Sequence, residues 1–257
     1  MRVSRRVQWY RDIIEVLLSK ELTVRYRGSF LGYLWSLMNP LALAMVFYLV
    51  FGVVMKFSTP HYLVSLLSAM FPWQWYSNSI GQGPFLFLAN ATLVKKVSFP
   101  RQVIPLITNL QDMVHFILAL PVYLGFMLAD GLYPSWIWLW GIPVLSVVTL
   151  VSIYGVCLFV GTLNLFFRDL GNLVNIILNI AFYGTPIVYS LETIPAKYLI
   201  YFSISPVAPL FICWRSMLMY NTLNMKFFLL SVGYALIFLL IGLFTYSRLS
   251  RRFAETM

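Results

Sequence analysis

Residues 28–55 contain no charged side chain, and the stretch is bounded by Arg27 on one side and Lys56 on the other. A helix that crosses the hydrocarbon core of a bilayer needs about 20 apolar residues. Such a helix satisfies its backbone hydrogen bonds within its own segment, which lipid surroundings require. The stretch therefore predicts a transmembrane helix, and the rest of the fold has to accommodate it.

Five further apolar stretches are long enough to be interpreted in the same way. The six expected spans are residues 31–55, 62–88, 104–128, 136–166, 171–190 and 227–247. Of the 257 residues, 61% are hydrophobic and 10% are charged, and the mean hydropathy is +0.83. A soluble domain usually carries about 25% charged residues. We therefore expect an all-α integral membrane fold with six transmembrane helices, in one domain over residues 1–257.

The positions of the basic residues predict the orientation of these spans. A net charge of +10 would indicate nucleic acid in a soluble protein, but here the basic residues are grouped between apolar spans. Fourteen of the 18 Lys and Arg fall in residues 2–27, 95–101, 168 and 248–252. With six spans all four groups lie on one side, so the positive-inside rule predicts cytoplasmic termini and no nucleic-acid partner. The outer side keeps Lys56, Lys197, Arg215 and Lys226.

Residues 3–18 predict a separate amphipathic helix. At 100° per residue, one face gathers Val3, Val7, Tyr10, Ile13, Ile14, Leu17 and Leu18. Charged and polar side chains occupy the opposite face, which is typical of a helix that lies in a membrane interface. This interface helix either anchors the chain to the inner leaflet or docks a partner.

Residues 191–226 are too apolar for an ordinary loop. They are also interrupted by Pro195, Pro206 and Pro209, so they do not predict a continuous span. A pair of short helices that re-enter the outer leaflet fits this pattern better. Irregular backbone at membrane depth is tolerated only against protein or a water-filled cavity. We expect this segment at an external mouth.

Motifs for catalysis or metal binding are absent from the sequence. It has no GxxxxGK[ST], HExxH or GxSxG pattern, and neither Cys157 nor Cys213 belongs to a CxxC pair. His61 falls at the outer end of a span. His115 follows Asp112 by three residues, so the two share a helix face. An interhelical hydrogen bond is the favoured interpretation of that pair, with a proton relay as the alternative. We expect no catalytic residue, metal or cofactor in this chain.

Several segments, taken together and in order, resemble one known family. They are RYRGSFLGYLWSLMNPL (25–41), FPWQWYSNSI (71–80), NATLVKKVSFPRQVIPL (90–106), LNLFFRDL (163–170), YGTPIVYS (183–190), ETIPAKY (192–198), SPVAPLFICWRSML (205–218) and RRFAETM (251–257). The set is similar to the membrane subunit of type-2 ABC exporters for cell-surface polysaccharides. That group includes the O-antigen (Wzm-like) and teichoic-acid (TagG-like) permeases. One segment alone would be a weak signal, but the ordered set is specific.

The resemblance implies a homodimer of six-span subunits in the inner membrane. Two copies of a separate ABC ATPase subunit would bind ATP and Mg²⁺, and the substrate would be a polysaccharide on a polyprenyl diphosphate lipid. The chain then divides into an interface helix with an entrance loop (1–28), a channel-forming region (29–250) and a cytoplasmic tail (251–257). The alternatives are an exporter of another cargo, such as a drug, haem or a lipo-oligosaccharide, a passive channel, and a membrane lipid transferase.

Two basic clusters are candidate sites on the cytoplasmic side. The first, about residues 90–101, mixes basic and apolar side chains and is expected to couple to the ATPase through Lys95, Lys96, Phe99 and Arg101. Plain topogenic charge is the alternative. The second is Arg25, Tyr26 and Arg27, where guanidinium groups match the oxygens of a lipid diphosphate. Ordinary phospholipids, which belong to the expected surroundings, would satisfy the same groups.

The resemblance also favours spans one and five as channel walls. Their aromatic rings could face sugar C–H surfaces, although packing and interfacial belts use the same residues. The channel-lining candidates are Tyr33, Trp35, Phe47, Tyr48, Phe51, Phe182, Tyr183 and Tyr189. The external gate candidates are Pro195, Pro206, Pro209 and Arg215.

Overall fold

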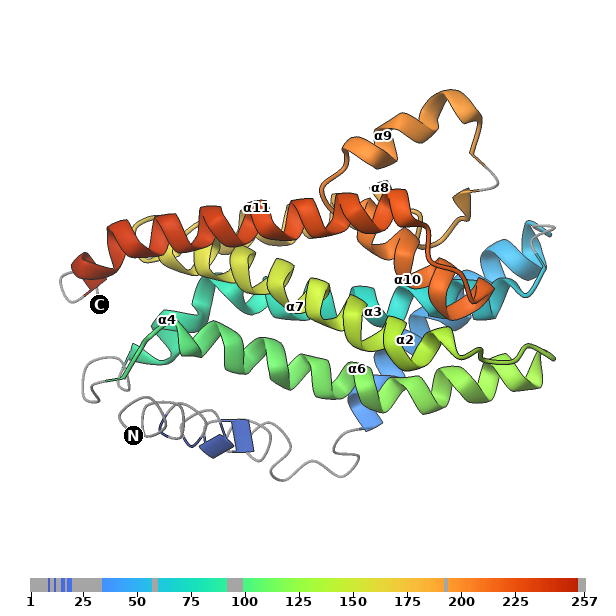
Figure 1. Cartoon of the computed structure of the whole chain (residues 1–257), viewed down its shortest axis with the longest axis horizontal. Helices are drawn as coiled ribbons and strands as arrows, with labels where there is room; N and C mark the ends of the chain where they lie inside the picture. The colour runs from blue at the N-terminus through green and yellow to red at the C-terminus, as the bar shows by residue number, and fades with distance from the viewer. Residues whose placement is uncertain are drawn as a thin grey trace.

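The computed structural model describes residues 34–56, 60–91, 99–191 and 194–253, together with positions 9, 12, 15, 16, 18 and 19. Throughout these ranges the regular elements are helical and no strand is formed, so the all-α prediction is confirmed there. The long helices run side by side along the longest axis of the molecule (Figure 1). The interface helix predicted at residues 3–18 lies largely outside the described residues.

The described residues form α-helices together with short 3-10 and π-helical pieces. In chain order they are α2 (Leu34–Phe47), η1 (Tyr48–Val54), α3 (Tyr62–Gln82), η2 (Gly83–Phe85), α4 (Leu86–Ala89), α6 (Val103–Ala129), α7 (Ile137–Asn164), α8 (Leu170–Gly184), η4 (Ala196–Tyr198), α9 (Leu199–Ile204), α10 (Ala208–Tyr220), α11 (Met225–Leu249) and η5 (Ser250–Arg252). The short helix α9 projects from one side of the bundle, whereas α10 runs within it (Figure 1).

Four helices in the described ranges are long and apolar enough to cross a membrane. They are Leu37–Val54, Val103–Ala129, Ile137–Asn164 and Met225–Arg252. Helix α3 has 21 residues, but it carries four Ser, two Gln and one Asn, and α8 has only 15 residues. The chain is therefore a multi-pass helical protein, and the count of six spans stays a prediction.

Two predicted spans do not continue as a single α-helix to their C-terminal ends, although residues 62–89 stay helical throughout as α3, η2 and α4. The span predicted at 62–88 leaves the α-helix after Gln82, where Gly83-Pro84 form a 3-10 turn. The span predicted at 171–190 ends as a helix at Gly184, and Thr185 is extended at φ −101° and ψ 142°. A residue that precedes proline is driven out of the helical region, and Pro186 follows Thr185.

Helix α3 forms the centre of the bundle. Fifteen of its 21 residues are buried, and it packs against α6, α10, α7 and α8. Helices α7 and α11 form the most extensive pair. Their backbones meet at Gly155 and Gly242, because a Cβ on Gly242 would overlap the carbonyl oxygen of Gly155. Small residues permit this close approach of membrane helices, and the bundle depends on it here.

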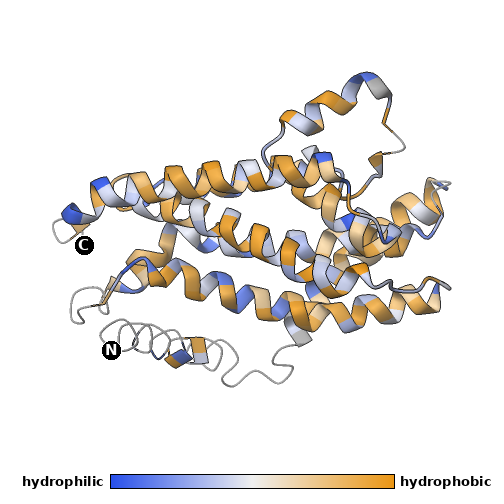
Figure 2. Ribbon diagram, viewed as in Figure 1, coloured by the Kyte–Doolittle hydropathy of each residue, from blue (hydrophilic) through white to orange (hydrophobic). Residues whose placement is uncertain are grey.

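Polar side chains inside the bundle connect α3 to α6. The Asp112 carboxylate accepts hydrogen bonds from Ser79 Oγ (2.8 Å) and Gln82 Nε2 (3.4 Å). Asn109 accepts from the Trp75 indole at 2.9 Å. Figure 2 shows this hydrophilic colour within α6, an otherwise hydrophobic helix. The predicted interhelical hydrogen bond of Asp112 is therefore confirmed, and it satisfies a carboxylate that is only 2% exposed.

Candidate functional site

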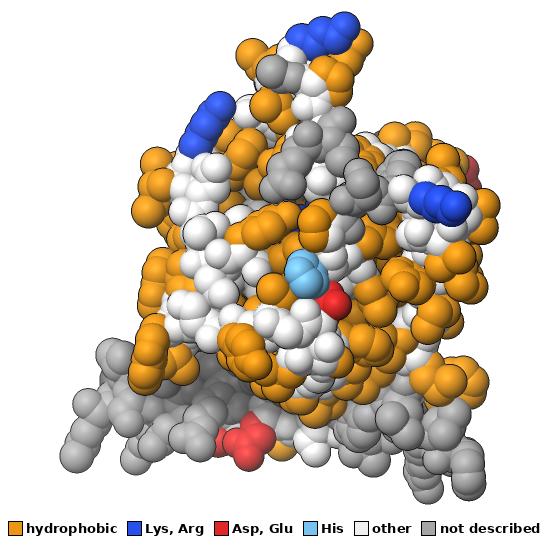
Figure 3. Space-filling view, turned by 90° about the vertical axis from the view of Figure 1, so that its right-hand side faces the viewer, with side chains coloured by type: hydrophobic (Ala, Val, Ile, Leu, Met, Phe, Trp, Pro, Cys, Tyr) orange, Lys and Arg blue, Asp and Glu red, His pale blue; other side chains and the backbone are white. Residues whose placement is uncertain are grey.

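One end of the bundle joins the beginnings and ends of several helices, and we call it the Asp130 end (residues 56, 61, 130–136 and 221). Asn221 Oδ1 accepts from the Ser135 backbone N–H at 3.0 Å, and Asn221 Nδ2 donates to the Tyr133 carbonyl at 3.0 Å. These bonds tie the α6–α7 connection to the end of α10. Figure 3 looks onto this end and shows an imidazole beside a carboxylate near its middle.

That imidazole and carboxylate belong to His61 and Asp130. His61 Nδ1 lies 2.7 Å from Asp130 Oδ2, and the two side chains are 39% and 42% exposed. His61 precedes α3 with a left-handed φ of 53°, whereas Asp130 ends α6. The bond therefore links the start of one helix to the end of another. His61 lies near a helix end, as its place in the sequence predicts, whereas its partner Asp130, 69 residues away, carries no local sequence signal of this contact.

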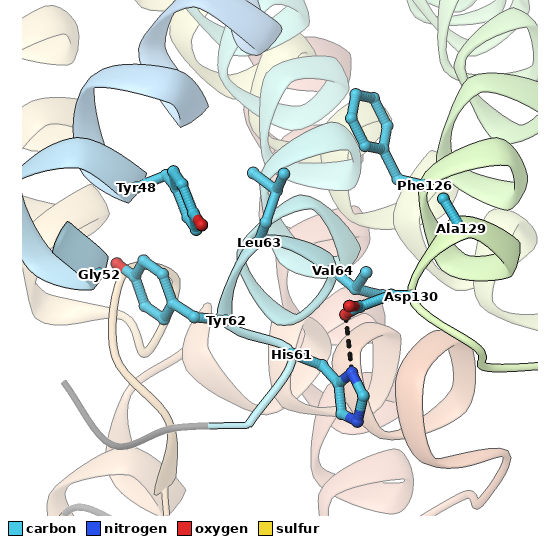
Figure 4. Close-up of a pocket in the computed structure, with 9 residues that line it drawn as sticks. All are labelled: Tyr48, Gly52, His61, Tyr62, Leu63, Val64, Phe126, Ala129 and Asp130. Carbon is cyan, nitrogen blue, oxygen red and sulfur yellow. Dashed lines mark hydrogen bonds and ion pairs between the residues drawn. The ribbon is translucent and has the colours of Figure 1, made fainter. Parts of the chain in front are cut away.

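A cavity of about 440 Å³ opens beside this pair. Its lining comes from three elements: η1, the first turn of α3, and the end of α6 (Figure 4). The lining residues are Tyr48, Gly52, His61, Tyr62, Leu63, Val64, Phe126, Ala129 and Asp130. Tyr48, predicted to line a channel, therefore faces this cavity, and the His61–Asp130 pair lines another part of it (Figure 4).

Arg215 holds the segment that follows α8. It lies on α10 and is 6% exposed, and its Nη1 donates to the Tyr189 carbonyl at 2.6 Å. Its Nη2 donates to the Ile187 carbonyl, and its Nε to the Ser65 carbonyl at 3.3 Å. The guanidinium thus joins α10, α3 and the extended chain. We call this arrangement the Arg215 clamp (Arg215 with the carbonyls of Ser65, Ile187 and Tyr189).

A tyrosine of α3 completes the arrangement around this extended segment. The Tyr62 hydroxyl donates to the Val188 carbonyl at 3.0 Å, so three successive carbonyls, 187–189, are held by side chains. Of the other gate candidates, Pro209 is buried in the first turn of α10, whereas Pro195 and Pro206 are exposed. The structure therefore separates Arg215 and Pro209, which are packed, from the two exposed prolines.

The channel-lining candidates fall into two groups. Phe182 of α8 contacts Phe47 of α2 at a centroid distance of 5.9 Å, and Tyr183 at 5.1 Å. Phe51 lies 6.1 Å from Phe47. The predicted walls α2 and α8 therefore meet through half-buried rings that also pack on the core. A second group lies apart: Trp35 is 56% exposed in the first turn of α2, and Tyr48 faces the cavity.

Tyr183 and Tyr189 are connected through the backbone. The Tyr189 hydroxyl donates to the Tyr183 carbonyl at 3.0 Å. The Tyr183 ring is 67% exposed, so its phenol is available to a second molecule or to solvent. The Arg215 clamp holds the Tyr189 carbonyl. The position of Tyr189, and its bond to Tyr183, therefore depend on the segment that follows α8.

The opposite end of the bundle is closed by aromatic residues, and we call it the Phe253 end (Phe87, Arg101, Tyr246 and Phe253). Phe253 is fully buried, at centroid distances of 5.1 Å from Phe87 and 5.8 Å from Tyr246. The Arg101 guanidinium lies 5.9 Å from the Phe253 ring centroid. Phe253, predicted to belong to a tail, is therefore packed into the bundle, whereas Arg251 and Arg252 are exposed.

Of the coupling candidates, the structure describes two. Arg101 contacts Phe253, and Phe99 is half-buried against the core. Lys95 and Lys96 lie outside the described residues, as do Arg25, Tyr26, Arg27 and Tyr33. Sequence reasoning missed Phe253, although a lone aromatic residue between two arginines and a polar terminus is a usable signal. Within the described residues no cluster of His, Cys, Asp or Glu could hold a metal ion.

Long apolar helices, a polar interior satisfied between helices and a buried arginine that fixes irregular backbone define a multi-pass membrane protein. The model of the ABC-2 type transporter family matches residues 13–219. The chain therefore belongs to the ABC-2 type transporter family.

Curated relatives resemble the chain over most of its length. One O-antigen export system permease protein RfbA of Klebsiella pneumoniae is 39% identical over 246 residues, covering 96% of this chain and 95% of the relative. A second protein of that name from the same species is 38% identical over the same shares. The RfbA permease of Myxococcus xanthus is 35% identical over 76% of this chain and 74% of its own length. The family predicted from the ordered segments is confirmed.

Proposed function

We propose that this chain is the permease subunit of an ATP-driven exporter that moves an O-antigen-like polysaccharide across the inner membrane. The observation that carries the proposal is its 39% identity, over 96% of the chain, to a protein named as an O-antigen export permease. The substrate would travel on a polyprenyl diphosphate lipid. In this proposal the permease is a homodimer, and two separate ABC ATPase subunits bind ATP and Mg²⁺.

Six spans per subunit belong to the same proposal, with α3 and α8 added to the four apolar helices. Helix α3 is buried by protein over most of its length, so it does not need the hydropathy of a lipid-facing helix. Helix α8 is about 22 Å long at 1.5 Å per residue, which is short for a hydrocarbon core of about 30 Å. Residues 185–190 would complete the crossing, and the held carbonyls of residues 187–189 support this.

The orientation follows from the basic residues. The Phe253 end would face the cytoplasm, because Arg101, Arg248, Arg251 and Arg252 lie near it in the chain. The Asp130 end would then face outward, with α9 and α10 at the external mouth. Arg25 and Arg27 would receive the lipid diphosphate at the inner leaflet. Residues 3–18 and 90–101 would transmit the movement of the ATPase subunits.

Deletion of the gene tests this function. We expect loss of long-chain polysaccharide from the cell surface, with lipid-linked polysaccharide accumulating inside the cell, and restoration of both by a plasmid copy. Surface staining and lipid extraction measure the two pools. Unchanged surface polysaccharide in the deletion strain would contradict the proposed function.

A further inference from the structure

Three exposed asparagines interrupt the apolar surface of α8. At 100° per residue, Asn172, Asn175 and Asn179 lie within about 60° of one another, and Tyr183 continues the row. The remaining circumference of α8 has two other sectors. Gly171 and Val174 are buried against the bundle, and an exposed apolar sector carries Leu173, Ile177 and Ile180. We call the row of Asn172, Asn175, Asn179 and Tyr183 the amide stripe.

The amides of the stripe are not satisfied inside the subunit. Among the residues that the structure describes, none forms a hydrogen bond with the side-chain amide of Asn172, Asn175 or Asn179. An amide transferred from water to an apolar medium without a partner loses several kcal/mol of favourable free energy. Polar residues within membrane helices therefore face a bundle interior or a water-filled path. The apolar sector of α8 is suited to contact with lipid, whereas the amide stripe is not.

The stripe continues onto α3. The side-chain oxygen of Asn175 lies 3.6 Å from the position that a Cβ on Gly81 would occupy. On the same helix, Gln74 Nε2 donates to Asn78 Oδ1 at 2.7 Å, and both side chains are half-buried. Polar groups of two helices thus lie along one seam of the subunit. From Asn172 to Tyr183 the stripe extends about 16 Å along the axis of α8, at 1.5 Å per residue.

We propose that Asn172, Asn175 and Asn179 form a ladder of hydrogen-bonding amides for the hydroxyl groups of the translocating glycan, with Tyr183 at its outer end. Each amide offers two donors and an acceptor, which match both roles of a hydroxyl group. Hydrogen bonds to water and to sugar hydroxyls are similar in strength, so a polymer exchanges one for the other and can slide. The ladder rests on the proposed export function and names the residues that contact the glycan.

A second copy of the chain is the competing occupant of the stripe. Seams between membrane helices are enriched in small residues that let backbones approach. Between Asn172 and Tyr183 the stripe and its exposed neighbours are Asn, Leu, Ile and Tyr, not Gly, Ala or Ser. The polar surface also extends over α3, so it is wider than the contact of one helix pair. These features favour a hydrated path.

Cysteine substitution measures whether the stripe faces water. The native Cys157 and Cys213 are buried, so their background reaction with a charged, membrane-impermeant methanethiosulfonate is low. We expect Asn175→Cys and Asn179→Cys in the assembled exporter to react, and Ile177→Cys, the control on the apolar sector of the same helix, to stay unmodified. Reaction of all three at one rate would overturn the ladder, as would no reaction at all. Oxidative cross-linking of two copies through Asn175→Cys without reagent access would assign the stripe to a subunit seam instead.

Measurement of export tests whether the amides contact the glycan during transport. The triple substitution of Asn172, Asn175 and Asn179 by Leu should lower surface polysaccharide by about tenfold or more, since three hydrogen-bonding positions are removed. The same triple substitution by Gln keeps the amides and should restore most export, and Ile177→Leu should change nothing. Membrane levels of each variant are compared by immunoblot.

The results of these experiments distinguish a failure of the ladder proposal from a failure of the proposed function. If gene deletion abolishes surface polysaccharide while the triple Leu variant exports like the wild type, the ladder is wrong and the function stands. If deletion leaves surface polysaccharide unchanged, the function is wrong. Equal loss of export in the Leu and Gln variants at normal protein levels would assign the stripe to helix packing and overturn the ladder.

Discussion

Arg215 and the extended residues after α8 satisfy one another. A buried guanidinium is costly unless its donors are bound, and carbonyls outside a helix are costly unless they accept. The helix ends at Gly184, so the carbonyls of Ile187 and Tyr189 have no helical partner and accept from Arg215. Arg215, together with the Tyr62 hydroxyl on the Val188 carbonyl, therefore holds residues 187–189 in place after α8.

Replacement of Arg215 by Gln tests this clamp. Three hydrogen bonds from a charged donor are lost or weakened, each with a net contribution of about 1.5–3 kcal/mol, so the purified protein should unfold at a clearly lower temperature. Arg215→Lys keeps the charge but not the forked geometry, and its effect should be intermediate. Thermal unfolding in detergent provides the measurement.

Arg168 offers the matched control for that experiment. It is exposed in the connection between α7 and α8, so Arg168→Gln should leave the unfolding temperature close to that of the wild type. If Arg215→Gln and Arg168→Gln unfold together with the wild type, the clamp does not stabilise the junction.

Among the helices, α7 and α11 are held by contact of their backbones. Gly155 and Gly242 leave no room for a Cβ, because the atoms that it would meet belong to the opposing main chain. Main-chain atoms cannot move aside as the end of a flexible side chain can. The pair therefore depends on two glycines, whereas Gly233 on the same helix α11 meets nothing within 4 Å of an added Cβ.

Replacement of Gly242 and of Gly233, both on α11, by alanine should change the stability of the protein in different directions. Gly242→Ala overpacks the seam and should cost about 1–3 kcal/mol of folding free energy. Gly233→Ala meets open space and restricts the unfolded chain, so it should be neutral or stabilise by about 0.4–1 kcal/mol. Thermal unfolding of both variants compares them directly. A Gly242→Ala protein as stable as Gly233→Ala would show that the helices separate without cost.

The segment between α4 and α6 is the element proposed to couple to the ATPase. Double charge reversal, Lys95→Glu with Lys96→Glu, should lower export and change the rate of ATP hydrolysis by the purified complex, because opposite charge at a docking surface weakens association. Substitution of both lysines by Arg keeps the charge and serves as the control. Wild-type export together with wild-type ATPase activity in the Glu variant would exclude a docking role for these lysines.

The whole subunit exposes apolar side chains over much of its length and presents a polar stripe on α8. Its exposed apolar residues lie on α2, η1, α6, α7, α8, α9 and α11, and a bilayer or a second copy would cover them. Within the subunit, Phe47 of α2 and Phe182 of α8 contact each other, so these two rings do not face an open path between their own helices. A path between two copies is the arrangement that we propose.

Purification of the assembled exporter tests this arrangement. We expect a complex of two permease chains and two ATPase chains, measured by native mass spectrometry in detergent. An affinity-tagged permease should also retain an untagged copy expressed in the same cells. A complex with one permease chain per particle would contradict a path between two copies.

The sequence predicted several elements closely, because membrane helices depend on apolar length. The span predicted at 104–128 is α6 (Val103–Ala129), and that at 227–247 is α11 (Met225–Leu249). Within the span predicted at 171–190 the helix ends at Gly184, because Pro186 drives Thr185 out of the helical region. The family was also predictable, since its segments occur in order along the chain.

Apolar length, the grouping of basic residues and the ordered segments were enough to define a multi-pass protein of the ABC-2 family. The side-chain contacts at the two ends of the helix bundle were not predictable from the sequence alone. His61 meets Asp130, Arg215 meets the carbonyls after α8, and Phe253 fills a space beside Phe87. Hydropathy depends on residues that are close together in the sequence. Each of these contacts joins residues that are far apart in the sequence, and it forms only when the helices have packed. The tertiary structure alone therefore decided which polar groups are satisfied and which, as in the amide stripe, are left for another molecule.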